Sequence, residues 1–162
     1  MAIYMNYDNN KIKGSVTAKG YEEWIDISSM QFGVGRGISM EVGGMSEREA
    51  TRPSISEISL SKAMDAASGG LFQQAVGGAE GVKVEIHIVR TGTAEIQKFA
   101  VYELENCLVS AYNVSASDGG SPFENFSLSF AKIMLDLSSI DSANKNATSA
   151  KIGYDLAMGT PL

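Results

Sequence analysis

The alternation of hydrophobic and polar positions predicts long β-strands in the second half of the chain. From Val82 to Ile88 the two kinds of residue alternate strictly, which is typical of a strand with one buried face. A turn at residues 91–93 precedes a second β-type run over residues 95–115, and a third run covers residues 123–138. The last two runs far exceed the usual strand of about 5–6 residues. Long strands joined by short turns favour a curled antiparallel barrel or sandwich.

Shorter strands are predicted in the first half. Residues 2–7 and 11–17 alternate and predict a hairpin-like pair around Asp8-Asn9-Asn10. Residues 21–35 also read as a strand, but the phase of the apolar positions changes after Ile27. Such a change is typical of a β-bulge, which we expect near Ser28-Ser29. Similar phase changes in the second and third long runs predict further bulges, which bend strands and help a barrel to close.

One short helix interrupts the strands. After a predicted strand over residues 54–62, Ser68 is a plausible N-cap, and Gly77-Gly78 is a plausible end. Leu71, Phe72 and Val76 lie between them at helical spacing, so we expect this face to cover one end or side of the barrel. Near the C-terminus, residues 138–149 are polar, and residues 152–157 predict a closing edge strand.

Residues 38–53 show no sustained periodicity of hydrophobic and polar positions. They mix glycines, methionines and charges of both signs, which predicts an extended loop of 16 residues. Loops longer than about 12–15 residues within a compact domain are uncommon and often functional. We expect this loop to dock against another molecule.

Length and composition favour one globular domain over residues 1–162. The formal net charge of −6 makes nucleic acid and anionic membranes poor partners. No apolar stretch is long enough for a membrane span, and the N-terminus lacks the features of a signal peptide. The single Cys107 cannot form an internal disulfide, which suggests folding in a reducing cytoplasm.

The search for chemistry predicts no catalytic, cofactor or metal site. His87 is the only histidine, and it falls on the polar phase of a strand, so we expect a solvated or interface residue. Gly33, Gly35 and Gly37 resemble a nucleotide-binding loop, but the helix that should follow is missing. The pairs Glu47/Glu49 and Glu103/Glu105 have the ordinary spacing of a strand's polar face. Cys107 has no nearby cation to activate it. We therefore predict that the protein is not an enzyme.

The order of elements resembles the hemolysin-coregulated protein (Hcp) family, the tube proteins of bacterial type VI secretion systems. The resemblance covers essentially the whole chain. It is carried by residues 58–68 with Leu71 and Ala75, residues 103–112 and 124–133, Gly20-Tyr21-Glu22-Glu23-Trp24-Ile25-Asp26-Ile27 and Ile152-Gly153-Tyr154-Asp155.

The resemblance implies a β-barrel subunit with one short helix that assembles into hexameric rings. Rings would stack into a tube that is fired from the cell and can carry or chaperone effectors in its lumen. The implied partners are further copies of the chain, type VI spike and sheath proteins, and effector proteins. The protein would be cytoplasmic before firing and then secreted without a signal peptide.

This picture assigns two sets of candidate residues. The long loop should reach a neighbouring ring, and its candidate stacking residues are Met40, Glu41, Met45, Glu47, Arg48, Glu49 and Arg52. Ser29 and Gln31 alternate with Met30 and Phe32, and they are candidates for lining the lumen. Two alternatives stay open: a monomeric ligand-binding β-barrel, and a secreted effector that acts on target cells.

Overall fold

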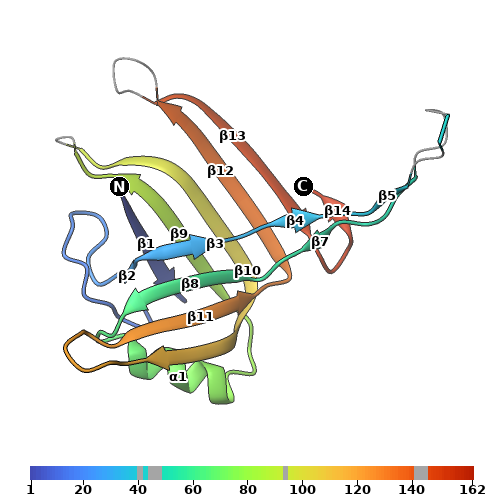
Figure 1. Cartoon of the computed structure of the whole chain (residues 1–162). Helices are drawn as coiled ribbons and strands as arrows, with labels where there is room; N and C mark the ends of the chain where they lie inside the picture. The colour runs from blue at the N-terminus through green and yellow to red at the C-terminus, as the bar shows by residue number, and fades with distance from the viewer. Residues whose placement is uncertain (40–41, 44–48, 93–94, 141–145) are drawn as a thin grey trace.

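The computed structural model describes residues 1–39, 42–43, 49–92, 95–140 and 146–162 and shows a mainly β chain with one short helix (Figure 1). The helix is α1 (Ser68–Gly77). The strands are β1 (Ala2–Tyr7), β2 (Ile25–Ile27), β3 (Ser29–Gln31), β4 (Val34–Gly35), β5 (Ile38–Ser39), β6 (Glu49–Ala50), β7 (Ser54–Ile55), β8 (Ile58–Ala63), β9 (Val82–Arg90), β10 (Gln97–Ser115), β11 (Phe123–Ser129), β12 (Lys132–Ile140), β13 (Asn146–Asp155) and β14 (Thr160–Pro161).

Seven of these strands form one series of paired neighbours whose two ends meet, here called the circuit. All its ladders are antiparallel and run in the order β2–β1–β9–β10–β11–β8–β3. The two ends of this series are consecutive in the chain, because β3 follows β2 after Ser28. At that point the Ser28 N–H donates to the carbonyl of Ser61 in β8 at 2.8 Å. The predicted irregularity at Ser28 is therefore the place where one strand leaves β1 and joins β8.

The circuit encloses the main core. Inward side chains of its strands and of α1 form one cluster of buried residues, and burying such a side chain stabilises the fold by about 1.5–3 kcal/mol. Leu71 of α1 is fully buried in this cluster, so the helix covers one side of the circuit. The largest fully buried apolar side chains are Met5, Tyr7, Ile25, Ile58, Leu60, Leu71, Ile86, Leu104, Phe126, Leu128 and Ile133.

The 19-residue strand β10 connects the circuit to a second group of strands. Its second half pairs with β11, and its first half pairs with β9 on one edge and β12 on the other. Beyond β12 lie β13 and β14, which extend away from the circuit as a wing (Figure 1). Register shifts occur in this run at Lys98/Ala100, Leu104/Cys107 and Val109/Ala111, so β10 is bulged, but not between Val101 and Tyr102, where the phase of its apolar residues changes.

The helix departs from the prediction in two details. Its N-cap is Ala67, and Ser68 is instead a buried first residue whose Oγ accepts from the Asp65 N–H at 3.0 Å. Phe72 and Val76 are also more than half exposed, although the Phe72 ring still lies edge-on to Tyr112 of β10 at a centroid distance of 5.9 Å. Because successive side chains are about 100° apart, the face that turns Leu71 and Ala75 inward turns Phe72 and Val76 outward.

The predicted strand over residues 11–17 is wrong. Asp8, Asn9 and Asn10 all have left-handed backbones, with φ between 49° and 59°, and only one bridge, Tyr7 to Ile12, follows them. This turn carries the chain away from β1. Residues 13–24, here called the flap, form irregular backbone bonds among themselves, such as Gly14 N–H to the Glu23 carbonyl at 2.8 Å. The flap lies over the outer face of β9.

Candidate functional site

Two described parts of the predicted extended loop and its flanks, residues 34–39 and 49–55, pair as a two-stranded ribbon, here called the arm. Strand β4 pairs with β7, and β5 pairs with β6. Between these pairs Thr51 N–H donates to the Gly37 carbonyl at 2.8 Å, while Thr51 Oγ1 accepts from Gly37 N–H at 2.8 Å. The arm projects away from the circuit (Figure 1). Val34 and Ile38 are 60% and 49% exposed, so the arm presents apolar side chains to its surroundings.

Two of the candidate stacking residues lie within the described part of the arm. Glu49 is in β6 opposite Ser39. Arg52 is exposed, but it lies beside the C-terminal turn of its own chain, since a methyl group placed on Gly159 would be 3.5 Å from Arg52 Nη1. Met40, Glu41, Met45, Glu47 and Arg48 lie outside the described residues.

The wing has one apolar face that its own chain leaves partly uncovered. Tyr102, Leu135 and Ile152 face one another across β10, β12 and β13, and Leu137 lies opposite Ala150. Ile152 is 51% exposed and Leu137 is 37% exposed. We call this surface the wing face (Tyr102, Leu135, Leu137, Ala150 and Ile152). The edge strand was predicted only over residues 152–157, because the polar composition of residues 146–151 hid their pairing with β12.

The lumen candidates Ser29 and Gln31 are exposed on β3. The Ser29 and Ser61 hydroxyls are hydrogen bonded, and Gln31 lies opposite Ser59. The same rows continue onto β11, so six uncharged polar residues share one outer surface of the β3–β8–β11 sheet. This serine face consists of Ser29, Gln31, Ser59, Ser61, Asn125 and Ser127. The prediction did not include Ser59 and Ser61. Their alternation with apolar residues in residues 54–62 could have indicated that they lie on the same outer face.

A buried polar cluster joins α1 to the circuit. Lys62 Nζ lies 2.7 Å from both Glu124 Oε2 and Asp65 Oδ1 and 3.4 Å from Ser68 Oγ. Buried charges in proteins are usually paired and hydrogen bonded in this way. Burial alone would raise the pKa of Glu124, but hydrogen bonds from Lys62, Ser68 and Tyr112 outweigh it and lower that pKa.

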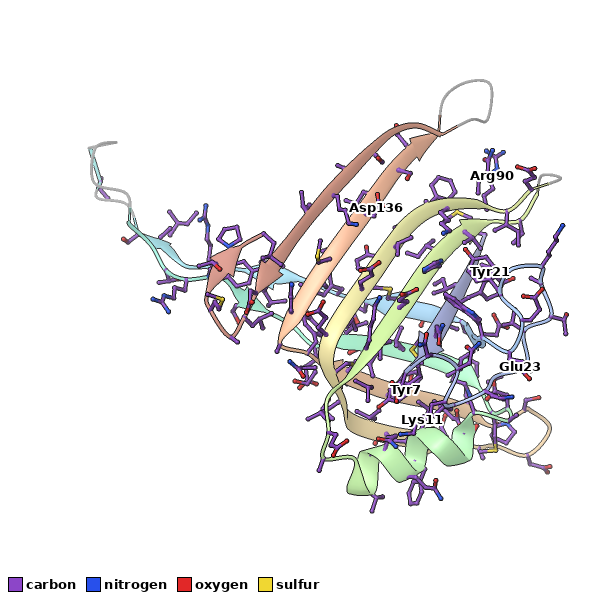
Figure 2. All side chains as sticks on the ribbon, turned by 180° about the vertical axis from the view of Figure 1, so that it is seen from behind. Tyr7, Lys11, Tyr21, Glu23, Arg90 and Asp136 are labelled. Atoms are coloured by element: carbon purple, nitrogen blue, oxygen red, sulfur yellow. The ribbon has the colours of Figure 1, made fainter. Side chains whose placement is uncertain are left out.

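His87 is buried, which corrects the expectation of a solvated or interface residue. The flap covers it: Tyr21 OH is hydrogen bonded to His87 Nδ1 at 3.0 Å, and the Trp24 ring centroid lies 4.7 Å from the imidazole. Burial and the nearby Lys98 lower the pKa of His87, although Glu85 opposes them. Figure 2 shows Tyr21 on the flap beside the sheet. Alternation along β9 places His87 on the outer face correctly, but it does not reveal what covers that face.

The other sites considered from sequence lack the necessary geometry. Gly33, Gly35 and Gly37 lead into the arm and not into a helix. Cys107 is fully buried, and burial raises the pKa of its thiol to about 12. Over the described ranges, no group of three or more His, Cys, Asp or Glu side chains could hold a metal ion. None of the helices in this part of the chain is long and apolar enough to cross a membrane.

Comparisons with known proteins identify the family. Residues 4–136 match the family model described as "Type VI secretion system effector, Hcp". A solved structure of a type six secretion system protein is similar, with 24% identity, a TM-score of 0.90 and coverage of 99% of each chain. Hcp1 from Salmonella typhimurium is 16% identical with a TM-score of 0.74, and the match covers 99% of this chain and 98% of that one.

Secreted protein Hcp3 from Pseudomonas aeruginosa is also similar, with 16% identity, a TM-score of 0.57 and coverage of 92% of this chain and 96% of that one. The search of curated proteins finds no match. The structural likenesses show the fold, and the family model covers most of the chain. The chain therefore belongs to the Hcp family, the structural, non-enzymatic tube proteins of type VI secretion systems.

Proposed function

We propose that this protein forms hexameric rings that stack into a type VI secretion tube and that the rings carry or chaperone effector proteins in their lumen. The tube would assemble in the cytoplasm, contact sheath and spike proteins, and be exported by the type VI system. Family membership supports this proposal, as does the secreted relative from Pseudomonas aeruginosa. In this proposal the wing face would make the ring contacts, the arm the stacking contacts, and the serine face would line the lumen.

The observation that carries the proposal is the uncovered apolar surface of the wing and the arm. Leu137 and Ile152 on the wing face and Val34 and Ile38 on the arm are all more than a third exposed. Clustered exposed apolar side chains mark protein–protein contacts, whereas single ones are ordinary. A head-to-tail contact that closes on itself produces a ring, so the wing face fits a contact with the next subunit.

The ring contact is tested by comparing Ile152→Lys with Val76→Lys. Both side chains are exposed, at 51% and 72%, but only Ile152 is on the wing face. Light scattering should give the parent protein and Val76→Lys the mass of about six subunits, and Ile152→Lys a lower mass. Equal masses for the two variants would remove the wing face from the ring contact.

The stacking contact is tested by replacing residues 41–52 with a short Gly/Ser turn. This change removes the β5–β6 pair but leaves β4–β7 and the circuit in place. We expect rings of unchanged mass that no longer stack into tubes in electron micrographs. A matched control replaces Ser117–Ser121, in the loop between β10 and β11, and should stack normally. Tubes formed without residues 41–52 would refute the role of the arm.

The lumen role of the serine face is tested by Gln31→Trp. An uncharged hydroxyl-rich wall has few strong contacts to offer, which suits the passage of different proteins. A large aromatic side chain would narrow the lumen and add an apolar contact. We expect intact rings with altered effector retention, measured by co-purification. Unchanged retention would count against a lumen position for Gln31.

The monomeric ligand-binding barrel is the second candidate, and two observations disfavour it. The inside of the circuit is occupied by the side chains of the main core, and the wing face would remain partly exposed to water in a monomer. The deciding measurement is the molar mass in solution over a range of concentrations. A monomer at every concentration would favour the ligand-binding alternative.

A further inference from the structure

A cleft of about 570 Å³ lies between the flap and the start of β10, on the opposite face of β9 from the main core. The flap contributes residues 19–21 and Trp24 to its lining, and the other side is formed by Glu95, Ile96 and Lys98, with His87 between them. None of the three assembly surfaces described above includes these residues. The cleft therefore requires its own explanation.

The apolar part of the cleft is held rigidly. Tyr21 is 5% exposed and belongs to a second buried cluster with Tyr4 and Val89, against which Trp24 and Ile96 pack. The Trp24 ring lies edge-on to Tyr21 at a centroid distance of 4.8 Å and to His87 at 4.7 Å. These contacts fix the indole, so the cleft offers a preformed apolar wall.

The charged part of the cleft is unusual for this chain. Among the described lysines, five form ion pairs with described carboxylates: Lys11, Lys13, Lys62, Lys83 and Lys132. Lys19, Lys98 and Lys151 form no ion pair with a described residue. Two of these three flank the cleft. In a protein of net charge −6, two ammonium groups without an ion-pair partner among the described residues, beside one apolar wall, favour the binding of an anion there.

The acidic groups near the cleft already have other partners. Glu95 lines the cleft and has an interaction partner, Glu22 beside Lys19 accepts from the Gly20 N–H at 3.0 Å, and Glu85 beside His87 is paired with Lys83 at 3.0 Å. Burial and the neighbouring Lys98 lower the pKa of His87, so Lys98 lies close to this lining residue, although Glu85 acts in the opposite direction. Small-molecule sites commonly combine an apolar wall with a few polar groups that fix orientation.

We propose that this cleft binds a small carboxylate that has an apolar, preferably aromatic, body. The carboxylate would lie between the Lys19 and Lys98 ammonium groups, and the body would pack on Trp24 and Ile96. Because Lys19 and Trp24 belong to the flap whereas Ile96 and Lys98 belong to the other side of the cleft, such a ligand would tie the flap to the sheet.

The test uses the fluorescence of Trp24, the only tryptophan of the chain, in the full protein and in whatever assembly it forms. The probes are phenylacetate, phenylacetamide and benzylamine, which share one body and differ in charge. We expect a saturable change with phenylacetate, about tenfold weaker binding of the uncharged amide, and no saturation with benzylamine. Equal affinity for acid and amide, or preference for the amine, would overturn the proposal.

Protein variants give a second, independent readout. Lys19→Met and Lys98→Met should each weaken phenylacetate binding about two- to fivefold, as expected for a solvent-exposed charge pair. Lys151→Met removes the third unpaired lysine, on β13, and should leave binding unchanged. Unchanged molar mass and melting temperature identify variants that remain folded. Equal binding by all three variants would overturn the proposal even if the probe series alone supported it.

Discussion

The circuit and the arm are both made of paired antiparallel strands, but they differ in how far their apolar side chains are exposed. In the circuit, Ile58, Leu60 and Leu128 are at most 2% exposed, and each strand has neighbours that cover its inner face. In the arm, the paired strands are two residues long, and Val34 and Ile38 are 60% and 49% exposed. The circuit therefore covers its own apolar side chains, whereas those of the arm remain available for a contact with another molecule.

The largest effect is expected where the circuit has a buried charge. Lys62→Met leaves Glu124 buried without its 2.7 Å partner, and breaking such a pair typically costs about 3–5 kcal/mol. The free energy of unfolding, measured by urea titration, should fall by this amount. Lys62→Met combined with Glu124→Met should recover part of the loss, since it removes the unpaired carboxylate. A loss below about 1 kcal/mol for the single variant would contradict the structural role of the pair.

The helix allows a matched comparison between a buried and an exposed apolar residue. Leu71→Ala removes a fully buried side chain and should lower the free energy of unfolding by about 2–5 kcal/mol. Phe72→Ala removes a larger side chain that is 55% exposed, and it should cost less than Leu71→Ala despite its size. Urea titration of both variants measures the difference, and the reverse order would mean that the helix is rotated about its axis.

A smaller effect is expected from the pH dependence of His87. Its pKa is lower in the folded protein, so the unfolded chain binds more protons as the pH falls through about 6.5, and stability decreases there. The decrease cannot exceed about 1.4 kcal/mol per pH unit for one proton. His87→Gln should remove this contribution, visible as a flatter plot of the free energy of unfolding against pH. Parallel plots for the two proteins would contradict the assignment.

The smallest effect on the isolated protein is expected in the arm. Thr51→Val removes the hydrogen bond between Thr51 Oγ1 and the Gly37 N–H. Because the arm lies outside the circuit, the free energy of unfolding should change by less than about 0.5 kcal/mol. Electron microscopy should nevertheless show fewer or shorter stacks if the arm mediates stacking. A large loss of stability would mean that the arm is coupled to the core.

Sequence patterns identified the strands whose side chains alternate between a buried and an exposed face. The strand predicted from Val82 and the second run are present as β9 and β10, because alternation is a direct consequence of burying one face of a sheet. The third run was predicted as one bulged strand, but it is divided after Ser129 into β11 and β12. Residues 11–17 also alternate, but the left-handed turn at Asp8, Asn9 and Asn10 prevents them from pairing along β1. Alternation indicates that a segment can form a strand, but it does not indicate whether another strand lies beside it to pair with.

Features that depend on distant contacts were not predictable in this way. The burial of His87 depends on the flap folding back over β9, and the polar start of β13 is a strand because β12 lies beside it. The pairing within the arm likewise depends on bonds such as that between Thr51 and Gly37. Ser29 and Gln31 were found as exposed residues because they alternate with Met30, but their shared surface with Ser59 and Ser127 requires the sheet order.

The position of β1 between β2 and β9 has a consequence for the order of events during synthesis. About 75 residues separate the end of β1 from the start of β9, and ribosomes add about 5–20 residues per second. The edge of β1 that pairs with β9 therefore remains without its partner strand for roughly 4–15 s. Strand β8 waits similarly for β11. During this interval the core around Met5 and Ile58 is incomplete, so apolar side chains that are buried in the folded protein stay exposed until β9 and β11 have been synthesised.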